Sequence, residues 1–155
     1  MPELQNLTTQ KIDAQTLRII DEISSQIDSV KQRQVERGML NSSSTIAQIT
    51  DVCNKGLNDL GKIIETEYRW MIDQELFATQ SSVESLIKKI PLELGPLQKT
   101  CISHIQRQSV LIRSPDHIAP NYIEKFEKTV NSVSENIVLS LRSFSAEKRR
   151  GIIRS

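Results

Sequence analysis

In four stretches the chain repeats apolar residues at alternating steps of three and four, and residues 120–150 show the pattern most clearly. Their apolar positions are Ile123, Phe126, Val130, Val133, Ile137, Leu141 and Phe144. These steps place the side chains on one stripe of an α-helix and leave the other faces to Lys, Glu, Ser and Asn. Because an exposed apolar stripe is unfavourable in water, each helix is expected to pack its stripe against another helix.

Polar loops and glycines between the stripes predict where the helices begin and end. We place the four helices at about residues 9–37, 45–79, 82–113 and 120–150. Thr8 is the expected N-cap of the first helix. Gly38 is its expected left-handed stop, after which Met39 or Leu40 folds back on the last turn. The same combination of a glycine followed by apolar residues predicts a second helix stop at Gly151.

The third stretch contains two prolines. Pro91 is expected to end one helical piece, because its ring and its missing N–H oppose continuation of the helix. Pro96 suits the first position of a new piece. The links between the four stretches are short, so successive helices should be antiparallel neighbours. The prediction is an all-α, up-down-up-down four-helix bundle in a single domain spanning residues 1–155, with its third helix broken near Pro91–Pro96. A three-helix coiled coil with a detached hairpin is the less favoured arrangement.

The second helix carries more apolar surface than one stripe needs. Ile63, Trp70 and Phe77 form a second row, seven residues apart, beside the main stripe. Tryptophan is enriched at the energetic centres of interfaces. It also suits a core in which the indole N–H lies near a polar edge, so the sequence leaves both interpretations open. Two glycines inside this helix, Gly56 and Gly61, each cost about 1 kcal/mol relative to alanine, which favours close approach by a neighbouring helix at these points.

Composition and charge narrow the class of function. The chain has 155 residues, of which 37% are hydrophobic and 25% charged, as in soluble helical proteins. Its 20 basic and 19 acidic residues leave a net charge of +1, so no global field attracts nucleic acid or an anionic membrane. No apolar run is long enough for a transmembrane helix, and the first ten residues do not have the pattern of a signal peptide. We therefore expect a cytoplasmic protein without membrane insertion.

A short basic cluster ends the chain, made up of Lys148, Arg149, Arg150 and Arg154. Clustered cations can neutralise phosphate groups, which gives nucleic-acid association as a minor alternative. Cations at the last turn of a helix are also favoured by the helix dipole, and this second explanation is preferred.

No motif in the chain specifies a chemistry. Cys53 and Cys101 fall on the apolar stripes of different helices and are expected to be core thiols. Cys101 and His104 lie one turn apart, but a structural zinc site needs four ligands and no second such pair exists. The second histidine, His117, lies on a separate element, so a catalytic triad has little support. We expect no metal, no cofactor and no enzymatic activity.

The leading hypothesis is a non-enzymatic interaction or structural module that binds a protein partner or further copies of itself. The interaction residues are predicted to be Ile63, Trp70, Phe77, Met39 and Leu40. Four-helix bundles of this length are also similar in layout to the ligand-binding domains of bacterial chemoreceptors. That similarity implies, as the alternative, a small-molecule site between helices near Pro91 and Pro96.

Overall fold

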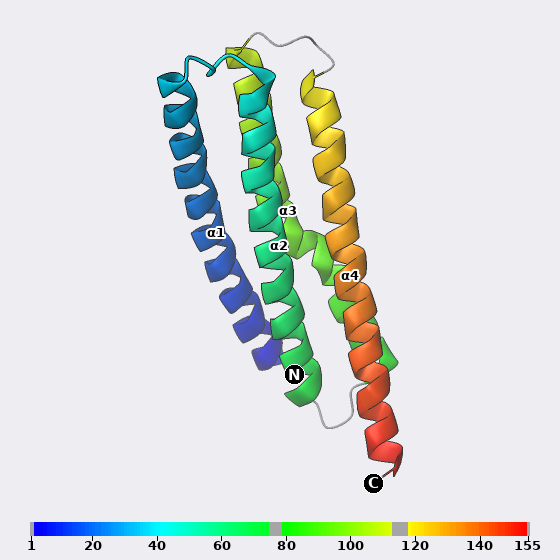
Figure 1. The fold of residues 1–155 in the computed structure, drawn as a ribbon. Coiled ribbons are helices and arrows are strands. Elements are labelled where there is room, and N and C mark those ends of the chain that lie inside the picture. Colours follow the sequence, from blue (N-terminus) through cyan, green and yellow to red (C-terminus); the bar gives the residue numbers. More distant parts are fainter. Residues whose placement is uncertain (1, 75–78, 113–117, 155) are drawn as a thin grey trace.

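The computed structural model describes residues 2–74, 79–112 and 118–154, which form four long helices. They are α1 (Pro2–Glu36), α2 (Ser43–Gln74), α3 (Gln80–Leu111) and α4 (Ile118–Arg154). Each helix runs antiparallel to the one before it (Figure 1). The described residues contain no strand, and the predicted all-α four-helix bundle is confirmed. None of these helices is both long and apolar enough to cross a membrane.

The second helix is the centre of the bundle. It packs against α1, α3 and α4, whereas α3 packs mainly against α2 and α4 and to a smaller extent against α1. Over the described ranges, α1 and α4 do not contact each other and lie on opposite sides of α2 (Figure 1). The described residues of α1, α3 and α4 each retain an outward face with exposed apolar side chains, among them Leu17, Leu92 and Leu139.

Apolar side chains from all four helices meet in one continuous core. Its fully buried members include Ile12, Ile27, Ile46, Ile49, Leu57, Leu60, Ile64, Leu97, Ile105, Phe126 and Leu141. Cys53 and Cys101 are also fully buried and are not joined by a disulfide, so the prediction of core thiols is confirmed. A hydrogen bond with Cys53, together with burial, raises the pKa of Cys101, which favours the protonated and unreactive thiol.

Both glycines inside α2 lie where a neighbouring helix approaches closely, as predicted. A Cβ atom added at Gly56 would lie 2.5 Å from Cδ1 of Ile23 on α1. A Cβ atom added at Gly61 would lie 2.6 Å from Cγ1 of Val133 on α4. Carbon atoms in normal contact are about 3.5–4.0 Å apart, so a Cβ atom at either position would require a neighbouring side chain or helix to shift.

The predicted stop at Gly38 is confirmed, and the predicted stop at Gly151 is wrong. Gly38 has φ 68°, and its N–H donates to the carbonyl of Val35 at 3.0 Å. The Met39 N–H donates to the carbonyl of Gln34 at 2.8 Å, which completes a Schellman motif. No other glycine in the described ranges has a positive φ, and α4 continues through Gly151 as regular helix. A helical glycine costs only about 1 kcal/mol, so glycine alone does not end a helix.

All four helices begin earlier than the sequence suggested, and α2 and α3 do so by two residues each, at Ser43 and Gln80. The first begins at Pro2 instead of residue 9, because proline is well suited to the first position of a helix. Thr8 therefore lies inside α1, where it is buried instead of acting as a cap. The fourth begins at Ile118, so Pro120 lies in the first turn, where no N–H is required for helix hydrogen bonds. The second runs to Gln74 in the described residues, and residues 75–78 lie outside them.

The predicted break in the third helix is wrong, because α3 is continuous through Pro91 and Pro96. Both proline rings are exposed, whereas Ile90, Leu94 and Leu97 on the opposite side are buried in the core. Each proline costs about 3 kcal/mol in a helix interior. Burying each of the three apolar side chains contributes about 1.5–3 kcal/mol, so packing offsets the prolines. They leave a bend near the middle of α3 (Figure 1).

Candidate functional site

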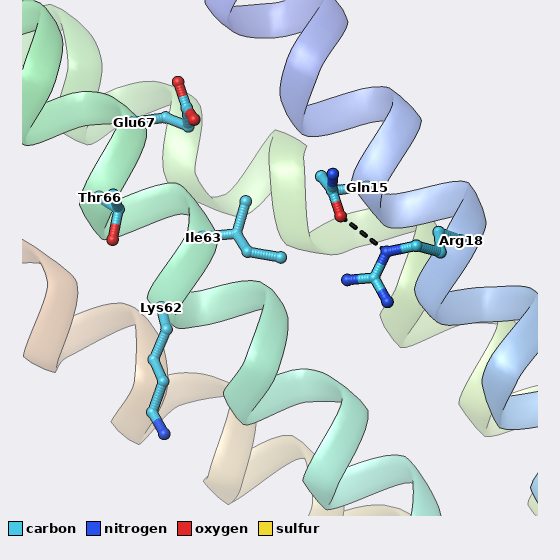
Figure 2. A pocket seen from close by; sticks show the side chains of 6 residues that line it. All are labelled: Gln15, Arg18, Lys62, Ile63, Thr66 and Glu67. Atoms are coloured by element: carbon cyan, nitrogen blue, oxygen red, sulfur yellow. Dashed lines mark hydrogen bonds between the residues drawn. The ribbon is translucent and has the colours of Figure 1, made fainter.

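The second apolar row of α2 lies at the seam between α1 and α2. Ile63 is half-buried there and points from α2 toward Gln15 and Arg18 of α1 (Figure 2). It lines a surface hollow of about 350 Å³, whose other walls are Gln15, Arg18, Lys62, Thr66 and Glu67. The hollow is therefore a mixed polar and apolar depression, and Ile63 is the one apolar residue among the six that line it.

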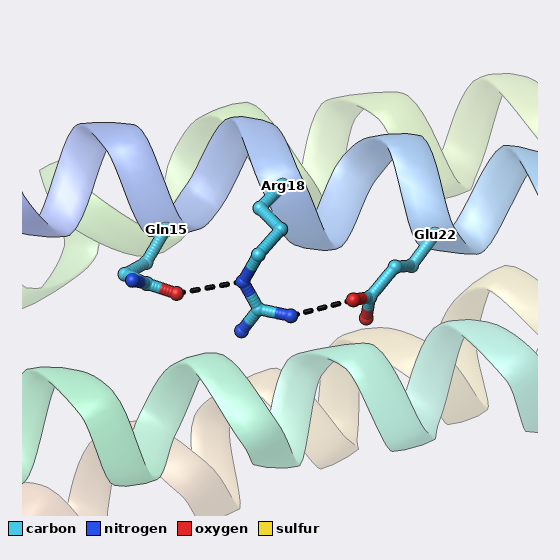
Figure 3. Close-up of polar contacts among 3 residues, drawn as sticks. All are labelled: Gln15, Arg18 and Glu22. Atoms are coloured by element: carbon cyan, nitrogen blue, oxygen red, sulfur yellow. Dashed lines mark hydrogen bonds and ion pairs between the residues drawn. The ribbon is translucent and has the colours of Figure 1, made fainter.

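Two cations, Arg18 and Lys62, line this hollow, and Arg18 is bonded to two residues of its own helix. The Arg18 Nε donates a hydrogen bond of 2.8 Å to Oε1 of Gln15, and its Nη1 forms an ion pair of 2.5 Å with Glu22 (Figure 3). Because Arg18 is already neutralised by a carboxylate on its own helix, it is poorly suited to hold an anionic ligand in the hollow.

Trp70 lies on the same seam and is 36% exposed. The Nζ of Lys11 on α1 lies 5.1 Å from the centroid of the Trp70 ring, in a cation–π contact. Such contacts at exposed sites contribute about 0.5–1 kcal/mol. The ring is thus partly covered by α1 and partly open to a partner. Phe77, the third member of the predicted row, lies outside the described residues.

Met39 and Leu40 form a fixed corner between α1 and α2. Met39 is exposed, and its carbonyl accepts hydrogen bonds from Ser42 Oγ at 2.7 Å and from Thr45 Oγ1 at 3.1 Å. Leu40 is half-buried, and its carbonyl accepts a hydrogen bond of 3.4 Å from Gln108 of α3. The corner therefore presents the Met39 side chain at one end of the bundle on a well-anchored backbone.

The C-terminal basic cluster has a structural use that sequence reasoning missed. The Nζ of Lys148 donates to two backbone carbonyls in the last turn of α2, at 2.7 Å for the carbonyl of Asp73. It thereby caps α2 from another helix, and this contact has no signature in the sequence. Arg149 donates to a carbonyl of its own helix, and Arg150 is exposed. Arg154 belongs to α4, and its side chain lies outside the described set.

A buried polar pair joins α2 to α3. The hydroxyl of Tyr68 donates a hydrogen bond of 3.2 Å to Oε1 of Glu93, and both side chains are buried. Burial raises the pKa of Tyr68 and the pKa of Glu93, whereas the hydrogen bond from Tyr68 lowers the pKa of Glu93. Sequence reasoning missed this pair because Glu93 fell in the predicted break. On a continuous helix it follows Leu86 and Ile90 along the core side.

The metal-binding residues considered from the sequence do not converge. In the part of the chain that the structure describes, no three His, Cys, Asp or Glu side chains are grouped to hold a metal ion. Cys101 is in the core, and His104 is half-buried near Lys31 and Arg107. Burial and the neighbouring cations lower the pKa of His104. His117 lies outside the described residues.

The most exposed apolar side chains lie on faces that sequence reasoning did not single out. Leu92 and Val110 on α3 are each 76% exposed, and they are followed by Leu17 on α1, Leu111 on α3, Leu139 on α4 and Val35 on α1. Val110 and its neighbour Leu111 line an apolar surface hollow of about 430 Å³. Leu92 falls in the predicted break near Pro91–Pro96, which concealed its place on the outer side of a continuous helix.

No family model, curated protein or solved structure matches this chain.

Proposed function

We propose that this chain is a helical-bundle interaction module that acts by presenting helix faces to other protein surfaces, with further copies of itself as the first partner. The observation that carries the proposal is that large apolar side chains stay exposed on the described parts of all four helices, while a separate set of apolar side chains already fills the core. Contiguous exposed apolar surface marks interaction sites, and Val110 with Leu111 forms such a surface on α3.

The edge of α2 formed by Ile63 and Trp70 supports one such interface. Trp70 offers a large, partly exposed ring, and the half-buried Ile63 lies nearby in the same seam. Tryptophan contributes disproportionately to binding energy when a partner removes it from water. We therefore propose self-association through this edge, with Phe77 extending the same row along the sequence.

The experiment is a measurement of weight-average mass by light scattering over a range of protein concentrations. The wild-type mass should rise with concentration, and Trp70→Ala or Phe77→Glu should weaken the rise while unfolding stays cooperative. Leu139→Ala, which truncates a 62% exposed leucine on α4, is the matched control and should associate like the wild type. A wild type that stays monomeric at all concentrations would refute self-association.

Small-molecule sensing is the second candidate function. It is favoured by the hollow between α1 and α2, whose volume of about 350 Å³ falls within the range of ligand pockets. A thermal-shift screen against a metabolite panel tests it, because a ligand bound to the folded state raises the melting temperature. Nucleic-acid association has less support, since Lys148 of the basic cluster is engaged on the end of α2.

A further inference from the structure

The outward face of α1 combines two apolar side chains with an acidic surface between them. Leu17 and Val35 are eighteen residues apart, about five turns at 3.6 residues per turn, so they lie on the same side of the helix. Between them, Asp21 and Asp28 are exposed. Neither carboxylate forms an ion pair with any described residue.

The outward face of α3 has the same apolar spacing with the opposite charge. Leu92 and Val110 are also eighteen residues apart, and both are 76% exposed. Between them, Lys99 and Arg107 are exposed, and no carboxylate of the described ranges pairs with either cation. The segment 94–111 contains no acidic residue at all. This face therefore lacks a partner for its charges as well as for its apolar side chains.

The two faces match when the helices run antiparallel. If Leu17 is placed opposite Val110, the equal spacing places Val35 opposite Leu92. In that register Asp28 lies opposite Lys99.

The same alignment places Asp21 opposite Gln106, next to Arg107 in the sequence. A parallel alignment would instead place Asp28 opposite Ser103 and Asp21 opposite Pro96, without either charge pair. The antiparallel alignment thus satisfies the apolar and the charged positions together.

We propose that α1 of one copy packs antiparallel on α3 of a second copy, with Asp28 facing Lys99. This inference rests on the proposed self-association and assigns it a second surface, separate from the Ile63–Trp70 edge. The two contacting faces are different parts of the molecule, so the contact is heterologous. A pair formed in this way keeps one free face of each kind, α3 on the first copy and α1 on the second, so repetition yields a closed ring or an open filament.

The charges around the contact are compatible with this arrangement. Lys31 is the cation on α1 nearest to Asp28 along the helix, and it is half-buried. Lys31 and the exposed Asp28 both lie close enough to His104 of the same chain to affect the pKa of that histidine, which burial and Lys31 lower and Asp28 raises. Because the new ion pairs form at the protein surface, the association should weaken as salt shortens the screening length from about 10 Å at 0.1 M.

Charge reversal tests the contact directly. Asp28→Lys and Lys99→Asp each place like charges opposite one another, and each should weaken association about tenfold or more at low salt in sedimentation velocity. The double variant Asp28→Lys/Lys99→Asp restores an opposite-charge pair and should recover wild-type association. An equimolar mixture of the two single variants should recover it as well. Glu135→Lys reverses an exposed charge on α4 and should change nothing.

Cysteine cross-linking tests the register. Cys53 and Cys101 are fully buried, so an added surface cysteine is the accessible thiol in each variant. A mixture of Leu17→Cys and Val110→Cys chains should form a cross-linked dimer under mild oxidation by copper phenanthroline. A mixture of Leu17→Cys and Leu92→Cys chains should not, and faster cross-linking in that second mixture would overturn the antiparallel alignment.

Three results would overturn the contact as a whole. These are wild-type association in both single variants, failure of the double variant to recover, and a wild type that is monomeric at low salt. If the charge variants associate normally while Trp70→Ala does not, this contact is wrong and the α2 edge stands. The opposite result would leave the α1–α3 contact standing and remove the α2 edge. All the exchanged charges are exposed, so the charge variants should have the same melting curves as the wild type by circular dichroism.

Discussion

Replacing Gly61 with alanine should destabilise the bundle, although alanine is the better helix former. The added methyl group would lie 2.6 Å from Cγ1 of Val133, which is buried on α4. Val133 cannot turn aside easily, because a β-branched side chain in a helix has one strongly preferred rotamer. The strain must instead be relieved by a shift of α4 away from α2.

The expected magnitude follows from two opposing terms. Alanine in place of glycine in a helix interior stabilises by about 1 kcal/mol. An extra methyl group in a packed site costs about 1–3 kcal/mol, and the stiff Val133 places this site at the upper end. The net loss is about 1–2 kcal/mol, or roughly 2–8 °C in melting temperature for a chain of this size.

Urea unfolding followed by circular dichroism measures this loss, and Gly151→Ala on α4 is the matched control. A Cβ atom at Gly151 meets nothing within 4 Å and no proline follows it, so that variant should gain up to about 1 kcal/mol. In a Val133→Ala background the obstructing methyl group is absent, and Gly61→Ala should become stabilising. The reasoning would be refuted if Gly61→Ala raised the urea midpoint in the wild-type background, as Gly151→Ala is expected to do.

Three further predictions concern buried and capping groups. Burial raises the pKa of Glu93 above its ordinary value of 4.5, so its contribution to stability is present below pH 4.5 and is lost as pH rises through the folded-state pKa. Glu93→Gln should remove this decline of the urea midpoint with pH. Parallel curves of urea midpoint against pH for the wild type and the variant would argue against this prediction. Lys148→Met should cost about 1 kcal/mol and speed hydrogen exchange in the last turn of α2, whereas Arg150→Met should do neither. Cys53 and Cys101 should resist a thiol reagent in the native protein and react in guanidinium, and rapid native labelling would contradict their burial.

The architecture could be predicted from the sequence because the apolar stripes and the short links are local features. The stripe on residues 120–150 packs into the core as expected, and the Gly38 corner forms as expected. Gly56 and Gly61 also lie at close helix approaches. Each of these features depends on spacing within one segment, and such spacing is visible without knowledge of the neighbours.

The errors arose where tertiary packing outweighs a local rule. Local propensity alone places a break at Pro91 and Pro96, yet burial of the opposite side of α3 keeps the helix intact. That error concealed both the Tyr68–Glu93 pair and the outward position of Leu92. Contacts between distant segments, such as the cap that Lys148 places on α2, also have no local signature.

The fold brings only some of the predicted interaction residues together. Ile63 and Trp70 lie together at the seam between α1 and α2, whereas Met39 and Leu40 lie at the corner between α1 and α2. The exposed faces of α1 and α3 become visible only when the packing of the bundle shows which sides of each helix remain uncovered.

The most direct test of function is sedimentation equilibrium of the wild-type chain at several concentrations, in low and in high salt. Self-association through apolar faces and complementary charges predicts a mass that rises above the 17.6 kDa monomer with concentration and falls back as salt is added. A mass of 17.6 kDa at every concentration in both salts would contradict it.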